Sequence, residues 1–157
     1  MQRYYFFCKT QKIFKFIKEN YKGSIEDCII RDTPDSDGKY IVDNEGSIGA
    51  KRQLNTLEND LFKWGKVNEF YCYSNNNVKD LKGAPEECNL FDCTGCRSLK
   101  SLEGAPKKCG EFVCAECVNL KSLKGAPEEC EAFDCVDCDS LESLEYSPKK
   151  CSSSLSA

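Results

Sequence analysis

The chain repeats itself every 21 residues over much of its length. Glycine recurs at this interval at Gly83, Gly104 and Gly125, and each of these residues is followed by Ala-Pro. Phenylalanine recurs in the same register, at Phe70, Phe91, Phe112 and Phe133. An earlier, less regular unit (VNEFYCYSNNNVKDLK) precedes the first Gly-Ala-Pro, and a partial unit (YSPKKC) follows the last. A unit of this length cannot bury its own apolar face, so the units have to stack on their neighbours.

Within each unit, the spacing of the apolar residues predicts one short strand and a tight return. The unit that starts at Gly83 has the pattern Cys88-x-x-Phe91-x-Cys93-x-x-Cys96-x-x-Leu99-x-x-Leu102. Phe-x-Cys has the period of two of a strand with one buried face, and the later spacing of three suits a 3-10-like return. The pattern resembles the leucine-rich-repeat consensus L-x-x-L-x-L-x-x-N/C-x-L. That resemblance implies an α+β protein with a leucine-rich-repeat-like solenoid, a short parallel β-sheet and little helix in the repeats.

Stacking places each residue above its copy in the next unit, and this predicts ladders. We expect the core to contain the phenylalanine ladder and a leucine ladder made of Leu81, Leu102, Leu123 and Leu144. The charged residues after proline alternate in sign from unit to unit: Glu86-Glu87, Lys107-Lys108, Glu128-Glu129, Lys149-Lys150. Residues 82, 103, 124 and 145 alternate as lysine and glutamate. Alternation replaces repulsion by attraction and disfavours a slip by one unit.

The region before the repeats predicts a cap for the solenoid. Residues 10–22 have the spacing of an amphipathic helix, in which Thr10 could cap the N-terminus and Ile13, Phe14, Ile17 and Tyr21 share one face. We expect this helix to pack on the end of the solenoid, although its lysines also suit a membrane surface. Residues 26–45 predict a β-hairpin, because two β-rich runs flank a turn of Pro, Asp and Gly.

A degenerate first coil is predicted between the hairpin and the repeats. Leu54 and Leu57 lie one period before Asn75 and Val78, and we expect Trp64 to close the core there. The sequence is therefore divided into an N-terminal capping region at 1–66 and a solenoid of about four units at 67–157. No comparable cap is evident after the last unit, so we expect an open strand edge there.

The 13 cysteines raise the question of a metal or redox site, because C-x-x-C occurs at Cys93/Cys96, Cys114/Cys117 and Cys135/Cys138. In the first unit the same two positions hold Cys72 and Asn75, and Asn is a poor zinc ligand. Histidine is absent from the chain. We therefore interpret most of these residues as small core hydrophobes with reduced thiols, without a cofactor. A zinc or redox site on the C-x-x-C pairs, or disulfides, is the alternative hypothesis.

Charge and hydropathy limit the classes of function. Residues 67–157 contain ten basic and 16 acidic residues, which is the wrong balance for direct nucleic-acid binding. No apolar run is long enough to span a membrane, and the first residues do not resemble a signal peptide. We find no P-loop, G-x-S-x-G or dinucleotide motif, and we predict no catalytic residues. These observations favour a non-enzymatic protein in the cytoplasm.

The run GKVNEFYCYSNNNVKDLKGAP, followed by LKSLEGAP, resembles the short leucine-rich-repeat proteins of bacteriophages and prophages. The chain departs from their pattern at Cys96, Cys117 and Cys138, where that family mostly has Asn. The resemblance implies a protein of the bacterial host cytoplasm that binds through its strand face. It also suggests an inhibitor of a bacterial immune effector, comparable to an anti-CRISPR protein. A structural phage component that self-assembles through the open strand edge is a further hypothesis.

The strand face is the predicted contact surface for a protein partner. It comprises the residues that flank the inward Phe and Cys positions, and we select Glu69, Tyr71, Tyr73, Asp92, Thr94, Glu111, Val113, Asp134 and Val136 as partner-binding residues. Asp92, Glu111 and Asp134, with Glu116 and Asp137 beside them, form an acidic strip that favours a partner with a basic surface. The two tyrosines are of a type enriched in binding hot spots. A merely solvated face is the alternative, and the sequence does not indicate the oligomeric state.

Overall fold

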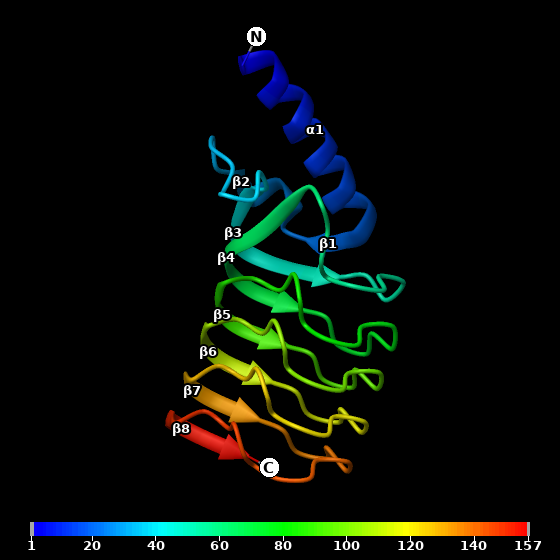
Figure 1. The fold of residues 1–157 in the computed structure, drawn as a ribbon, viewed down its shortest axis with the longest axis vertical. Coiled ribbons are helices and arrows are strands. Elements are labelled where there is room, and N and C mark those ends of the chain that lie inside the picture. The colour runs from blue at the N-terminus through cyan, green and yellow to red at the C-terminus, as the bar shows by residue number, and fades with distance from the viewer. Residues whose placement is uncertain (1, 157) are drawn as a thin grey trace.

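The repeat units stack as successive coils of a β-solenoid in the computed structural model of the chain, which describes residues 2–156 (Figure 1). The elements in chain order are α1 (Gln2–Asn20), β1 (Tyr21–Gly23), the 3-10 helix η1 (Ile25–Asp27), β2 (Cys28–Ile30), β3 (Tyr40–Ala50), β4 (Phe62–Tyr71), β5 (Glu87–Asp92), β6 (Lys108–Val113), β7 (Glu129–Asp134) and β8 (Lys150–Ser156). Strands β3 to β8 are parallel neighbours in one sheet, and β1 and β2 pair with β3 in antiparallel orientation. The predicted fold class, a repeat solenoid with a parallel sheet and little helix, is confirmed.

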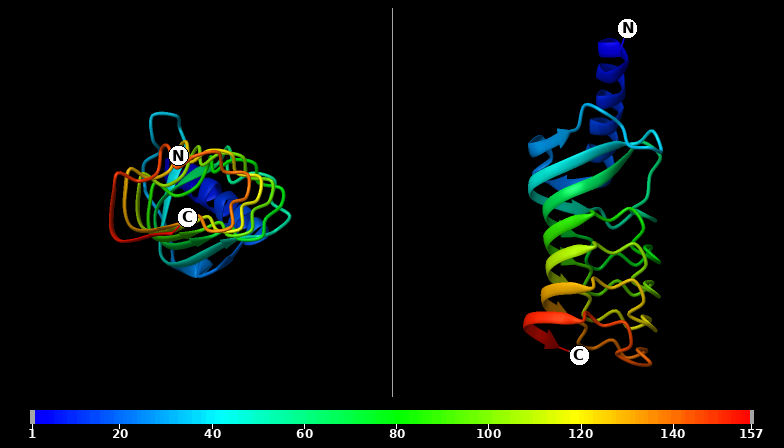
Figure 2. Two further views of the ribbon diagram at one scale, coloured as in Figure 1. Left: turned by 90° about the horizontal axis from the view of Figure 1, so that it is seen from below. Right: turned by 60° about the vertical axis from the view of Figure 1, so that its left-hand side comes forward.

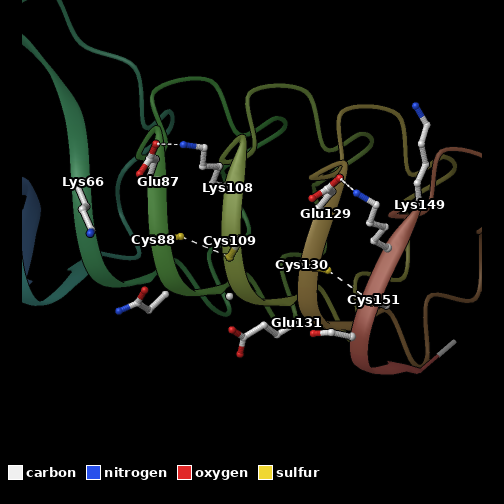
Figure 3. A pocket seen from close by; sticks show the side chains of 14 residues that line it. Lys66, Glu87, Cys88, Lys108, Cys109, Glu129, Cys130, Glu131, Lys149 and Cys151 are labelled. Atoms are coloured by element: carbon white, nitrogen blue, oxygen red, sulfur yellow. Dashed lines mark hydrogen bonds and ion pairs between the residues drawn. The ribbon is translucent and has the colours of Figure 1, made fainter.

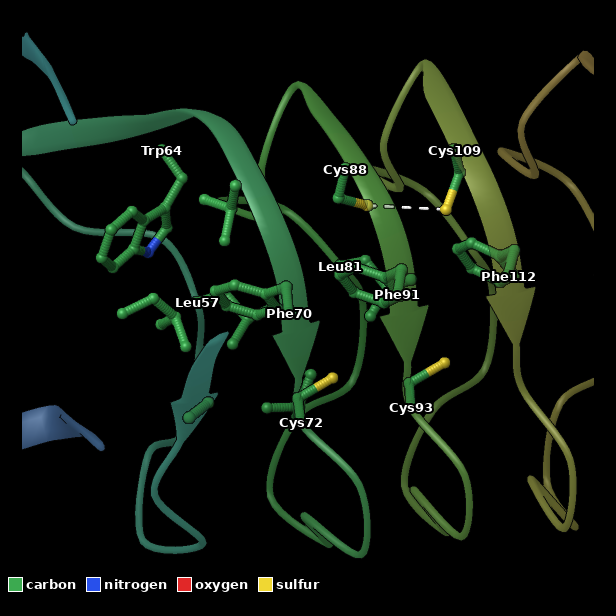
Figure 4. Close-up of a cluster of buried hydrophobic side chains, with 14 of the residues drawn as sticks. Leu57, Trp64, Phe70, Cys72, Leu81, Cys88, Phe91, Cys93, Cys109 and Phe112 are labelled. Atoms are coloured by element: carbon green, nitrogen blue, oxygen red, sulfur yellow. Dashed lines mark hydrogen bonds between the residues drawn. The ribbon is translucent and has the colours of Figure 1, made fainter. Parts of the chain in front are cut away.

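The core is a stack of repeated side chains between the sheet and the returning segments (Figure 4). Phe70, Phe91, Phe112 and Phe133 lie in register on successive strands. Their rings are stacked, with centroids 5.6, 5.2 and 5.6 Å apart and planes inclined by 7°. Burying large apolar side chains in this way is the main contribution to folding.

The leucine ladder is confirmed for three of its four predicted members. Leu81, Leu102 and Leu123 are fully buried, whereas Leu144 is 46% exposed. The prediction that Leu144 belongs to the core was therefore wrong. Each inner leucine is covered by the coil that follows it, and within residues 2–156 no further coil follows Leu144.

Glycine at the start of each unit allows two coils to approach each other closely. Gly83, Gly104 and Gly125 have φ values of 89°, 89° and 95°, which side chains with a Cβ rarely adopt. A Cβ at Gly104 would lie 2.4 Å from the backbone nitrogen of Lys82 in the preceding coil. The sequence motif thus reflects both a turn and a backbone contact, and Tyr146 takes the equivalent place in the last coil with φ 68°.

The N-terminal cap differs in detail from the predicted one. Helix α1 begins at Gln2 and not near residue 10, so Thr10 is not an N-cap, and its hydroxyl donates to the carbonyl of Phe7 inside the helix. Ile13 and Ile17 are buried as predicted. Tyr21 is also buried, but it belongs to β1, where its ring packs edge-on against Trp64 at 5.2 Å. The end of α1 that contains these isoleucines closes the core, and the other end projects beyond the solenoid (Figure 2).

The predicted hairpin is present as β2 and β3, which pair from Cys28 opposite Asn44 to Ile30 opposite Val42. Its second strand has an additional role, because β3 is also the first strand of the parallel sheet and lies against β4. The regular stack therefore begins before the first recognisable repeat, and residues 66 and 67 both lie inside β4. Leu57 and Trp64 are buried at this end, as expected for the degenerate coil.

The alternating charges form ion pairs between neighbouring coils. Glu87 pairs with Lys108 at 2.9 Å, and Glu129 pairs with Lys150 at 2.5 Å. A third pair joins the Glu103 carboxylate to the Lys124 ammonium group at 3.4 Å on the returning side. All three are exposed, so they specify register more than they stabilise the fold.

Candidate functional site

The strand face consists of rows of outward side chains that run across the coils. Parallel register aligns Glu69, Leu90, Glu111 and Ala132 in one row and Tyr71, Asp92, Val113 and Asp134 in the next. Backbone hydrogen bonds from Ser74 to Thr94, from Gly95 to Ala115 and from Glu116 to Val136 extend the alignment by a third row, Tyr73, Thr94, Ala115 and Val136. All nine residues selected from the sequence therefore lie in these three rows.

The two tyrosines form an ordered cluster at the N-terminal end of this face. The rings of Tyr71 and Tyr73 contact edge-on with centroids 6.1 Å apart, and Tyr73 is 39% exposed. The Glu69 carboxylate accepts hydrogen bonds from the hydroxyls of Ser47 at 2.5 Å and Tyr71 at 3.0 Å. These bonds, with that from Ser47 the stronger influence, lower the pKa of Glu69 below its ordinary value. The Glu69 carboxylate is therefore held by two hydroxyls, which favour its ionised form.

Two of the selected carboxylates have a structural role. Asp92 accepts a hydrogen bond from the backbone N–H of Thr94 at 2.8 Å, and Asp134 accepts one from Val136 at 3.0 Å. Each bond closes a short turn at the end of its strand, the usual Asx geometry. Substitution of either residue would change the backbone as well as the surface, so neither is suitable for testing a contact.

The remaining acidic residues of the face are more exposed. Glu111 is exposed on β6 beside the partly buried Val113, and Val136 is 36% exposed on the last inner coil. Glu116 and Asp137 lie at the turn that follows the third row, both with positive φ. The three rows and these turn positions include no lysine or arginine from β4 to β7. All the charged side chains in these rows and turn positions are therefore acidic, while Lys22 of β1 lies beside Tyr73 at their N-terminal end.

Two residues of this surface were missed by the sequence analysis. Ser47 lies opposite Glu69 on β3, and Lys22 on β1 places its ammonium group 5.5 Å from the centre of the Tyr73 ring. Both come from strands outside the recognisable repeat. The signal for Ser47 was present, since the neighbouring Ile48 aligns with Phe70 at a spacing of 22, one more than the repeat.

The C-x-x-C cysteines are turn and core residues with a common hydrogen-bonding pattern. In the first unit, the side-chain amide of Asn75 donates to the carbonyls of Lys51 and Leu54. The Cys96 thiol donates to the carbonyl of Cys72 at 3.0 Å, and this carbonyl lies 24 residues upstream, the same separation as between Asn75 and Lys51. Cys117 and Cys138 repeat the bond at 3.2 and 3.1 Å. Each cysteine thus replaces an asparagine that caps the coil before it.

The cysteines at the other position of the C-x-x-C pairs have the environment of core residues. Cys72, Cys93 and Cys114 are at most 1% exposed, and burial raises the pKa of Cys135 to about 11. All 13 cysteines are free thiols. Among the described residues, no group of three or more Cys, Asp or Glu side chains is placed to hold a metal ion. The described part of the chain also contains no helix that is long and apolar enough to cross a membrane.

Comparison with family models, with curated proteins and with solved structures gives no match for this chain.

Proposed function

We propose that the protein is a non-enzymatic binding scaffold whose strand face docks on a protein partner with a basic surface. The observation that supports this most is the set of three outward rows from β4 to β7, in which all the charged side chains are acidic and a tyrosine cluster lies at one end. Such a face steers an oppositely charged partner and supplies aromatic anchors for it. Because the Glu69 carboxylate is fixed by two hydroxyls, the partner does not have to order it.

The experiment compares two double variants with the same change in net charge. Glu111→Lys/Glu116→Lys reverses two carboxylates of the strand face. Glu128→Lys/Glu142→Lys reverses two exposed carboxylates on the returning side, at positions where other units already have Lys107, Lys149 and Lys121. The proposal expects a partner captured from bacterial lysate by wild type and by the control pair, but lost with the strand-face pair.

Salt dependence provides a second readout for the same capture. Recovery of the partner should fall as ionic strength rises, because exposed charges are screened over about 8 Å at 0.15 M salt. Equal recovery of every partner by all three proteins would show that the strand face is only a solvated surface.

A narrower proposal concerns the partner's identity. The resemblance of the repeats to those of phage and prophage proteins supports a host protein as the partner, in the bacterial cytoplasm. An immune nuclease has a basic nucleic-acid groove, which the acidic face would complement, so we propose inhibition by occupation of that groove. The test is cleavage by such nucleases with and without the protein, in which the strand-face pair should relieve the inhibition and the control pair should not.

Self-assembly is a second candidate, favoured by the last coil. Strand β8 is the final strand of the sheet within residues 2–156, and Leu144 and Tyr146 beside it are 46% and 55% exposed. Unpaired strand edges next to apolar side chains are sites of edge-to-edge association. A solution mass above that of one chain, reduced by Leu144→Lys, would support the structural role, and a strictly monomeric mass would exclude it.

A further inference from the structure

A second column of cysteines lies outside the C-x-x-C pattern, at the start of each strand. Cys88, Cys109, Cys130 and Cys151 are the residues that follow the alternating Glu-Glu and Lys-Lys pairs. Cys88 pairs in register with Cys109, and Cys130 pairs with Cys151. Side chains in register on parallel strands stack directly over one another. The four thiols therefore form a column across the N-terminal ends of strands β5 to β8 (Figure 3).

The column is divided into two equivalent dithiol pairs. The sulfur atoms of Cys88 and Cys109 are 3.5 Å apart, and those of Cys130 and Cys151 are also 3.5 Å apart. Cys109 also donates to the carbonyl of Glu111 at 2.9 Å, and Cys151 donates to that of Ser154 at 3.2 Å. The same sulfur–sulfur distance thus occurs twice, 42 residues apart, in one buried and one partly buried pair.

These thiols share an open groove that none of the C-x-x-C cysteines lines, although Cys135 and Cys138 are 2% and 9% exposed elsewhere. All four line an open groove of about 830 Å³ that crosses the N-terminal ends of strands β5 to β8. Cys88, Cys109 and Cys130 retain 5 to 8% exposure and Cys151 more, whereas Cys93, Cys96, Cys114 and Cys117 have none. An ion that enters the groove therefore meets the sulfur atoms of this column first.

Charge along the groove favours a negatively charged sulfur centre. Lys66, Lys108, Lys149 and Lys150 line it together with Glu87, Glu129 and Glu131. Lys108 and Lys150, which hold the ion pairs to Glu87 and Glu129, directly precede Cys109 and Cys151. Four lysines against three glutamates give the groove a net positive charge, which offsets the negative charge that develops on the dithiol pairs.

We propose that each pair, Cys88 with Cys109 and Cys130 with Cys151, binds one Cu(I) ion in linear coordination by two thiolates. Binding of one Cu(I) displaces the two thiol protons to solvent, so each centre gains one negative charge and no electron is transferred. Thiolate sulfur is the ligand that this soft cation prefers. Strands lie about 4.8 Å apart, so the sulfur atoms can separate to span the ion without movement of the backbone. A structural zinc site uses four ligands, and neither pair has a third protein ligand within the described residues 2–156.

The first unit of the chain supplies the variants for the test. Val67 lies opposite Cys88 on β4 and is fully buried, so valine is compatible with this position. Cys109→Val/Cys151→Val removes one thiol from each pair. As a matched control, Cys96→Asn/Cys117→Asn/Cys138→Asn introduces the residue that Asn75 already provides at the turn. The control removes more thiols than the test variant, so a general effect of cysteine content would reduce its binding more.

Copper is measured by native mass spectrometry of the full chain under anaerobic conditions, with ascorbate as reductant and a competing Cu(I) chelator. Wild type and the asparagine variant are expected to hold two copper ions per chain, each with the loss of two protons. Cys109→Val alone should hold one and the double valine variant none, while circular dichroism shows that both remain folded. Two ions in the double valine variant, or fewer in the asparagine variant than in wild type, would overturn the proposal. Absence of bound copper in wild type would do so as well.

Discussion

The inner coils and the last coil have similar sequences but different environments. Leu81, Leu102 and Leu123 are fully buried, and Leu144 at the same repeat position is 46% exposed. The inner turns use glycine with φ near 90°, and the last turn uses Tyr146 with φ 68°. The difference shows that a repeat residue acquires its structural role from the interface between coils and not from its own unit. The same substitution should therefore have different effects in the two places.

The largest effect is expected in the leucine ladder. Leu102→Ala removes a fully buried side chain and should cost about 2–5 kcal/mol of unfolding free energy, because it loses burial and leaves a cavity. Leu144→Ala should cost less than about 1 kcal/mol, since its side chain already contacts water. Urea denaturation of both variants measures the difference. Equal losses would mean that the last coil is covered in solution, as self-association would require.

The turns provide the second test. Gly104→Ala places a Cβ 2.4 Å from the backbone of Lys82 at a φ of 89°, and it should destabilise the fold by about 2 kcal/mol or more. Tyr146→Gly should instead be neutral or stabilise the fold by up to about 1 kcal/mol, because it relieves a left-handed backbone at a residue that is 55% exposed. Thermal melting of the two variants shows directly whether each substitution raises or lowers the stability of the fold. A destabilising Tyr146→Gly would show that this ring makes a contact that its exposure does not suggest.

The fold was largely predictable because the same apolar pattern recurs in every unit, so each unit supports the interpretation of the others. Phe91, Cys93 and Leu102 each have copies in register in the neighbouring units. The Phe-x-Cys alternation in one unit therefore predicts the strand and its buried face in every unit. The C-x-x-C pairs were interpreted correctly as turn and core residues because Asn75 occupies the same place in the first unit. The register also placed the nine strand-face residues in three rows.

The parts that could not be predicted are those where the repeat signal ends. Strand β3 is offset from β4 by 22 residues at Ile48 and by 23 at Asn44, because bulges interrupt their pairing. Helix α1 begins earlier than the apolar pattern indicates, and the buried residues that the pattern identified, Ile13 and Ile17, lie in its second half. Leu144 satisfies the repeat, but no further coil covers it within residues 2–156, and the periodic pattern does not show this. The structural roles of Asp92 and Asp134 depend on local turn geometry, which the strand pattern does not contain.

The smallest effect concerns the surface, where the inner coils and the last coil should behave alike. The exposed pair Glu87–Lys108 joins two inner coils, and Glu129–Lys150 joins an inner coil to the last one. Lys108 lowers the pKa of Glu87 from 4.5, so the pair stabilises the fold above pH 4.5, and this contribution is lost as the pH falls through the lowered value. Glu129 raises the pKa of Lys150, so that contribution is complete below pH 10.5 and is lost as the pH rises through the raised value.

Glu87→Gln and Glu129→Gln should therefore produce equally small losses of unfolding free energy at pH 7. Both losses should diminish in high salt, because the pairs are exposed and screened. Urea denaturation at low and high ionic strength measures this, with the loss from Glu87→Gln expected to diminish as the pH is lowered below 4.5. A clearly larger loss for the inner pair would mean that the surface also depends on position along the solenoid. The alternative result is that the two glutamine variants lose equal unfolding free energy while the leucine and turn substitutions differ between inner and last coils. The difference between the coils would then lie in the buried core and the turns, and not in the surface ion pairs.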